Sequence, residues 1–111
     1  MKTFSIKRGD TWRQSFENED DDGKPIVLTG SSAWFQLREK GSDRVLLDSS
    51  EVEGMLRIDN STVYLEVHAE LMATLPIGKH LFDIETTYPD GTVLTSETYA
   101  LKVIKDVTRT L

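Results

Sequence analysis

The sequence predicts an all-β fold: a sandwich of short strands in one domain that covers residues 1–111. Three observations lead to this prediction. Apolar and polar residues alternate in short segments, as they do in strands that bury one face. Residues that favour turns separate these segments. The chain also has a length typical of a single hydrophobic core.

The first two segments are separated by a single turn signal. Phe4 and Ile6 alternate with polar residues, and Trp12 and Phe16 lie on one face of the next segment. Because only a short turn at Gly9-Asp10 lies between them, we expect one kinked strand that changes sheets. Trp12 is therefore expected in the core.

Further strands are expected from the same alternation, giving seven to nine in all. They are predicted at residues 33–38, 44–48, 55–59, 63–68, 81–88 and 99–103. Turn residues separate them, and Asp22-Gly23 and Pro89-Asp90-Gly91 are good hairpin tips.

One short helix is predicted over residues 69–75, with Leu71 and Leu75 on the same side. Pro76 ends it, because the residue before a proline avoids helical geometry. One or two turns suffice to cross from one sheet to the other. The segment that follows, residues 75–84, favours an immunoglobulin-like antiparallel sandwich, in which a tyrosine usually occupies the corner held here by His80 or Phe82.

Composition excludes several classes of protein. Hydrophobic residues make up 38% of the chain and charged residues 29%, an ordinary globular mixture. No apolar run approaches the roughly 20 residues that cross a bilayer, and no signal peptide is recognised. The absence of cysteine excludes disulfides, thiolate zinc sites and cysteine nucleophiles. We expect synthesis in a reducing cytoplasm.

The net charge of −6 comes mainly from residues 17–22, which contain five of the 19 acidic residues. The remaining 14 acidic residues nearly balance the 13 basic ones. The basic surface that nucleic acid requires is therefore not expected.

The acidic segment contains part of a calcium-binding pattern. Asn18, Asp20 and Asp22 match the start of an EF-hand loop, but Thr29 stands where the bidentate glutamate is needed. We predict a solvated hairpin loop whose charges protect an exposed edge. Asp20 and Asp22 remain weak candidates for a divalent cation, and no cofactor is predicted.

The sequence does not predict an enzyme. His68 and His80 lack a third ligand in register, because Asp83 would lie on the opposite face of a strand from His80. No serine lies in a nucleophile elbow or a Ser-x-x-Lys pattern, and no glycine-rich phosphate loop occurs.

Three residues are candidates for protein contacts: Trp34, Arg38 and Tyr64. If Phe35 and Leu37 face the core, Trp34 faces outward, and tryptophan and arginine are common interface anchors. The alternative is that Trp34 packs beneath a loop or that the strand has the opposite register.

The order of these segments resembles small immunoglobulin-like β-sandwich proteins of tailed bacteriophages and prophages, among them the N-terminal domain of baseplate upper proteins. The resemblance rests on framework segments over nearly the whole chain. They are FSIKRGDTW at the start, GKPIVLTG and AWFQLR next, LPIGKHLFDI and DGTV later, and VIKDVTR, which ends at Arg109.

The resemblance implies a structural or adaptor protein of a virion, in a tail, baseplate or fibre attachment, that binds other virion proteins or packs in a symmetric ring. It implies no particular functional residue. The alternative is a carbohydrate- or receptor-binding module that uses Trp34, Tyr64 or Tyr88, with calcium at Asp20 and Asp22.

Overall fold

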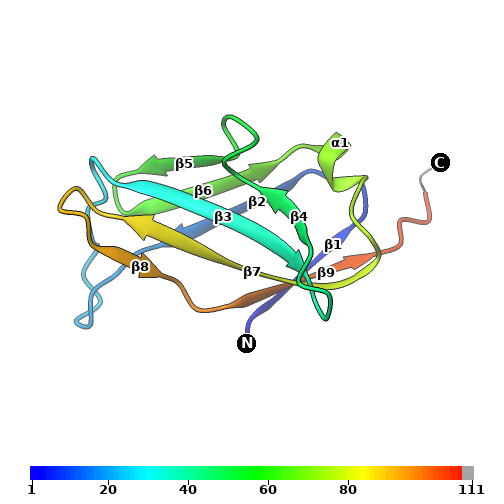
Figure 1. Ribbon diagram of the computed structural model, residues 1–111, viewed down its shortest axis with the longest axis horizontal. Helices are drawn as coiled ribbons and strands as arrows, with labels where there is room; N and C mark the ends of the chain where they lie inside the picture. Colours follow the sequence, from blue (N-terminus) through cyan, green and yellow to red (C-terminus); the bar gives the residue numbers. More distant parts are fainter. Residues whose placement is uncertain (109–111) are drawn as a thin grey trace.

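The computed structural model describes residues 1–108, and Arg109 lies outside the described residues. Within this part of the chain nine strands and one four-residue helix form a single elongated body (Figure 1). The strands are β1 (Thr3–Lys7), β2 (Trp12–Glu17), β3 (Ser32–Glu39), β4 (Val45–Asp48), β5 (Leu56–Asp59), β6 (Thr62–Val67), β7 (Gly78–Thr87), β8 (Val93–Thr95) and β9 (Tyr99–Ile104), and the helix is α1 (Ala69–Met72).

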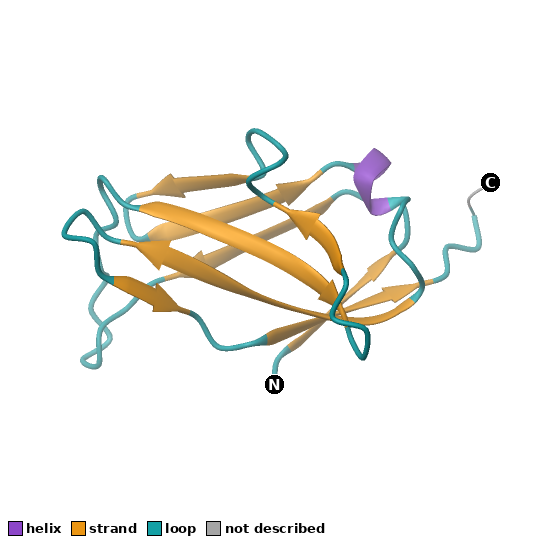
Figure 2. Cartoon of the chain, in the orientation of Figure 1, coloured by secondary structure: helices purple, strands orange, loops and turns teal. Residues whose placement is uncertain are grey.

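The strands form two sheets that face each other across the core, which confirms the predicted sandwich. The six-stranded sheet has the order β1-β9-β7-β3-β4, and β8 also pairs with β7. The three-stranded sheet has the order β2-β6-β5. In Figure 2 nearly all of the regular structure is strand, and the one short helix lies at the upper right, at one end of the strands.

The predicted alternation places aromatic rings between the sheets. Trp12 on β2, Phe35 on β3 and Phe82 on β7 are all almost fully buried. The ring of Phe82 lies 5.3–6.1 Å from five other aromatic rings, contributed by both sheets. Edge-to-face contacts at these distances stabilise a core beyond the area that they bury.

Within residues 1–108 four connections pass from one sheet to the other, and two of them were predicted. Gly9, with φ of 89°, lies between β1 in the six-stranded sheet and β2 in the three-stranded sheet. The other predicted connection is α1, which links β6 to β7. Its Met72 and the following Leu75 are buried, so the short crossover is held by packing rather than by helix propensity.

The strand order is that of an immunoglobulin-like sandwich. In such folds strands B, E and D share one sheet and C, F and G the other. The three-stranded sheet matches the first group, with β2, β6 and β5 corresponding to B, E and D. In the six-stranded sheet, β3, β7 and β9 correspond to C, F and G. The ring centres of Trp12 on β2 and Phe82 on β7 are 5.3 Å apart. These two strands correspond to strands B and F, which a disulfide joins in antibody domains. Aromatic packing therefore links the sheets in a chain without cysteine.

His80 occupies the corner at which such folds usually have a tyrosine. It is buried in β7, and its Nε2 donates a hydrogen bond of 2.8 Å to the carbonyl oxygen of Pro76. A corner tyrosine binds the backbone a few residues upstream in the same way. This hydrogen bond therefore links the connection between α1 and β7 to β7 itself.

Two features were not predicted. β1 pairs in parallel with β9, with Phe4 opposite Leu101, and so is the edge strand on one side of the six-stranded sheet. β8 is a short strand whose three residues are all exposed, so it lacks the alternation that reveals a strand. No helix within residues 1–108 has the length and apolar character needed to span a membrane.

Candidate functional site

Trp34 lies on the outer face of the six-stranded sheet, 42% exposed. Its neighbour Phe35 is completely buried, so the predicted register is confirmed and the alternative placements of Trp34 are wrong. Arg38 lies on the same face of β3, four residues further along. Two of the three predicted interaction residues therefore share one surface.

A hydrogen-bonded network holds Trp34 in place. Its indole Nε1 donates to Asp48 Oδ1 at 2.8 Å, across the β3–β4 pair. Gln36 Nε2 donates to Asp48 Oδ2 at 2.7 Å, and Arg38 Nη2 donates to Gln36 Oε1 at 2.8 Å. We call the surface formed by Trp34, Gln36, Arg38 and Asp48 the Trp34 face.

Asp48 is the centre of this network, and the sequence analysis did not single it out. Besides the bonds from Gln36 and Trp34 it accepts two from Ser50, through the backbone N–H and the hydroxyl. Hydrogen bonds from Gln36, then Ser50, then Trp34 hold the pKa of the carboxyl well below its ordinary value. The carboxylate is thus charged and fully engaged, and it fixes the indole with little freedom left to lose on binding.

We expect Asp48→Ala to lower the melting temperature at neutral pH by a few degrees, because several hydrogen bonds are lost. The folded-state pKa of Asp48 is depressed, so its contribution is present above its ordinary value of 3.8 and is lost as the pH falls through the lower folded value. The gap in unfolding free energy between wild type and variant should therefore narrow below about pH 4. Urea titrations between pH 7 and 2.5 would measure it. A gap that widens at low pH would contradict this role.

Apolar groups and a shallow hollow complete the Trp34 face. Val45 on β4 pairs with Arg38 and is also 42% exposed. Beside it is a hollow of about 200 Å³, whose lining includes Arg38, Leu81 and Asp83. An exposed indole, an arginine and a depression in a rigid sheet are the usual parts of a protein-binding hot spot.

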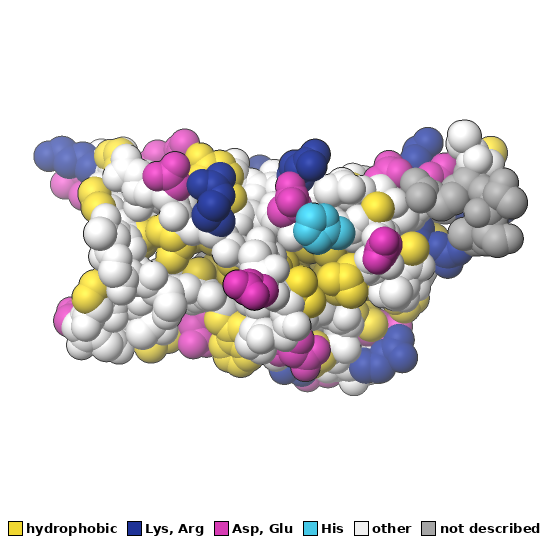
Figure 3. Space-filling view, turned by 90° about the horizontal axis from the view of Figure 1, so that it is seen from above, with side chains coloured by type: hydrophobic (Ala, Val, Ile, Leu, Met, Phe, Trp, Pro, Cys, Tyr) yellow, Lys and Arg dark blue, Asp and Glu magenta, His cyan; other side chains and the backbone are white. Residues whose placement is uncertain are grey.

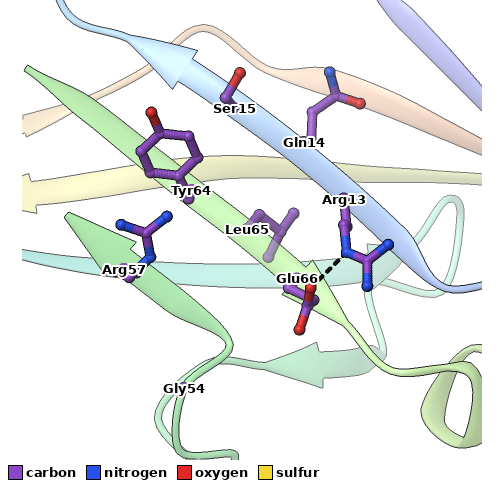
Figure 4. Close-up of a pocket in the computed structure, with 8 residues that line it drawn as sticks. All are labelled: Arg13, Gln14, Ser15, Gly54, Arg57, Tyr64, Leu65 and Glu66. Carbon is purple, nitrogen blue, oxygen red and sulfur yellow. Dashed lines mark hydrogen bonds and ion pairs between the residues drawn. The ribbon is translucent and has the colours of Figure 1, made fainter. Parts of the chain in front are cut away.

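Tyr64, the third predicted residue, lies on the other side of the molecule. It is on the outer face of the three-stranded sheet, where the guanidinium of Arg57 lies 4.4 Å from the centre of its ring. Arg13 and Glu66 form an ion pair of 2.6 Å beside it, as Figure 4 shows. This hydrogen bond and the charge of Arg13 lower the pKa of Glu66. The hollow here, about 430 Å³, is separate from the Trp34 face.

The aromatic residues suggested for carbohydrate binding do not form one platform. Trp34 and Tyr64 lie on the outer faces of opposite sheets, and Arg57 covers one face of the Tyr64 ring. Tyr88 packs against the core at the end of β7. A sugar would thus meet only one of these rings at a time.

The acidic loop is organised by Asp20 itself. Asp20 Oδ1 accepts hydrogen bonds of 2.9 Å from the backbone N–H groups of Asp22 and Lys24, while its own N–H donates to the carbonyl of Lys24. Its carboxylate therefore serves the turn, as Asx turns do. Within residues 1–108 no three acidic, histidine or cysteine side chains gather where they could hold a metal ion.

The two histidines are in different settings. His68 is exposed just after β6, whereas His80 is buried in β7 and engaged with Pro76.

Charge is mixed on one face of the molecule. Seen from the side on which β5 and α1 lie, acidic and basic side chains are dispersed, with hydrophobic ones between them (Figure 3). Comparison of the sequence with known protein families and with curated proteins finds no match.

Proposed function

We propose that the chain is a non-enzymatic structural or adaptor protein of a bacteriophage or prophage virion, and that it acts through protein–protein contacts. The observation that carries the proposal is the Trp34 face. An indole that is 42% exposed is held by Asp48 on the outer face of the six-stranded sheet. Exposing so large an apolar group at a fixed position serves binding better than it serves folding.

The chemistry of the face favours a protein as its partner. Trp34 and Val45 supply apolar area, and Gln36, Arg38 and Asp83 supply polar groups around it. Such a mixture of aromatic anchor and polar surround is typical of protein interfaces. β4 forms the open edge of the same sheet, so an incoming chain could contact both the face and an edge strand.

The virion part of the proposal rests on the resemblance of the framework segments to tail and baseplate sandwiches. A rigid sandwich suits a virion, because it can be packed in a ring or carry another protein at a fixed angle. The partner would then be another virion protein or a second copy of the chain.

Incorporation into particles tests the proposal. A phage or prophage that lacks the gene would be supplied with tagged wild-type protein, Trp34→Ala or Tyr64→Ala, and gradient-purified particles would be immunoblotted. We expect wild-type protein in the particles and at least about tenfold less of Trp34→Ala, in line with the loss of a hot-spot tryptophan.

Tyr64→Ala is the matched control, because it removes an aromatic ring from the opposite face. Melting curves should show that both variants remain folded. Wild-type protein absent from the particles would refute the virion role. Equal incorporation of Trp34→Ala would refute the role of the Trp34 face.

A further inference from the structure

A second surface lies at the end of the sandwich where the acidic loop and the β7–β8 hairpin meet, at the left of Figure 1. This surface includes β8, which is paired with another strand on one side only. β7 pairs with β9 along residues 78–82 and with β8 along residues 85–87. β1 pairs with β9 only, so within residues 1–108 β8 has no second neighbour.

Alternate residues of β8 form hydrogen bonds with β7, and the backbone groups of the other residues face the side that has no neighbouring strand. Tyr88 donates to the carbonyl of Thr92, and Ser96 donates to the carbonyl of Ile84. Because bonded pairs alternate in an antiparallel ladder, the N–H and C=O groups of Val93 and Thr95 point away from β7. They are available to a further strand.

An apolar groove opens beneath this edge, between the two sheets. Its volume is about 230 Å³, and Phe16 and Ile26 line one side while Leu94 and Tyr99 line the other. Burial raises the pKa of the Tyr99 hydroxyl, as expected at the floor of such a groove.

The groove continues into exposed apolar surface. Ile26, Tyr88 and Leu94 also line an adjoining depression of about 490 Å³, together with Val27. Val27 is 61% exposed and Leu94 54%. Apolar residues gathered in this way, beside an unpaired strand edge, mark a place where another chain binds.

The rim of the groove is acidic. Residues 16–28 contain five acidic residues and one basic residue, and residues 88–99 contain two acidic and no basic residues. Glu17 and Glu19 line the groove itself, and Asp90 lines the adjoining depression. A chain that binds here gains from positive charges on both sides of its apolar part.

We propose that the β8 edge and this groove bind an extended segment of a partner protein, with apolar residues at alternate positions and lysine or arginine at its ends. The segment adds a strand beside β8, so that its backbone bonds Val93 and Thr95 while its apolar side chains enter the groove. A second copy of this chain is a poorer fit, since joining two β8 edges brings two acidic rims together. The site is independent of the Trp34 face.

The test uses the chain of 111 residues and an acetylated peptide, KVTVTVKR, as the probe. We expect amide signals of residues 93–95 and of the groove to shift in ¹⁵N-resolved NMR titrations with up to about 1 mM peptide, the weak end of specific binding. The charge-reversed peptide EVTVTVED should bind at least about tenfold more weakly, and so should KVPPTVKR, whose prolines remove a strand-pairing N–H whether the segment adds parallel or antiparallel to β8.

Two variants test separately the contribution of backbone hydrogen bonds at β8 and that of the acidic rim. Thr95→Pro removes an N–H that faces away from β7, so the fold should persist while the affinity for the peptide falls about tenfold or more. Glu17→Lys/Glu19→Lys should weaken binding by a similar factor and reduce its salt dependence. Tyr64→Ala, on the outer face of the three-stranded sheet, should leave binding unchanged.

If Thr95→Pro proves unfolded, the variant Glu17→Lys/Glu19→Lys alone tests whether the peptide binds at the groove. The proposal is overturned if KVTVTVKR does not bind, if it binds no better than its charge-reversed form, or if the shifts fall outside the groove. Self-association that is lost in Thr95→Pro, without any binding of peptide, would show that a second copy is the occupant instead.

Discussion

Replacing Phe82 by Ala should cost about 3–5 kcal/mol of the free energy of unfolding, the usual range for a buried phenylalanine. The ring lies at the centre of the aromatic core, in contact with Trp12 and Phe35 and with three further rings. Its removal leaves a cavity that both sheets line. Because a small domain is stable by about 5–15 kcal/mol, this single change should approach complete loss of the fold.

Urea denaturation followed by circular dichroism would measure the loss. Leu81→Ala is the matched control, since it removes an apolar side chain from the next residue, on the outer face of β7. We expect it to cost less than about 1 kcal/mol. Similar costs for the two variants would show that the core is not centred on Phe82.

Replacing Leu101 by Lys should prevent stable folding. Leu101 is completely buried in β9, opposite Phe4 on β1 and His80 on β7. The variant loses the burial of a leucine, worth about 2–5 kcal/mol. It also places a charge in a core that, within residues 1–108, has no buried aspartate or glutamate to pair with it.

The next residue provides the control. Lys102 is exposed on the outer face of the same strand, so β9 already carries a lysine one position away. Lys102→Leu should change the unfolding free energy by no more than about 0.5 kcal/mol. A folded Leu101→Lys protein with a melting temperature near that of wild type would contradict the assigned register of β9.

The fold was predictable where burial leaves a local pattern. Alternation at Phe35 and Leu37 identified β3, and Gly9 and the helix before Pro76 marked two of the four connections between the sheets within residues 1–108. β8 was missed because none of its residues is buried. The parallel pairing of β1 with β9 was missed because it joins the two ends of the chain, and local sequence does not specify the partner of a strand.

The candidate site was predictable in part for the same reason. Alternation alone placed Trp34 and Arg38 outward on one face. It could not show that Asp48 holds the indole, because that contact depends on the register between β3 and β4, which has a shift between Leu37 and Arg38. Nor could it show that Tyr64 lies on the opposite sheet.

Site-specific photo-crosslinking in assembled particles tests the central claim most directly, namely that the Trp34 face binds protein. A photoreactive amino acid would replace Gln36, which lies between Trp34 and Arg38, or Ser15, on the outer face of the other sheet. We expect a crosslink to a virion protein or to a second copy from position 36, and far less from position 15. A crosslink from position 15 but none from position 36 would contradict the claim.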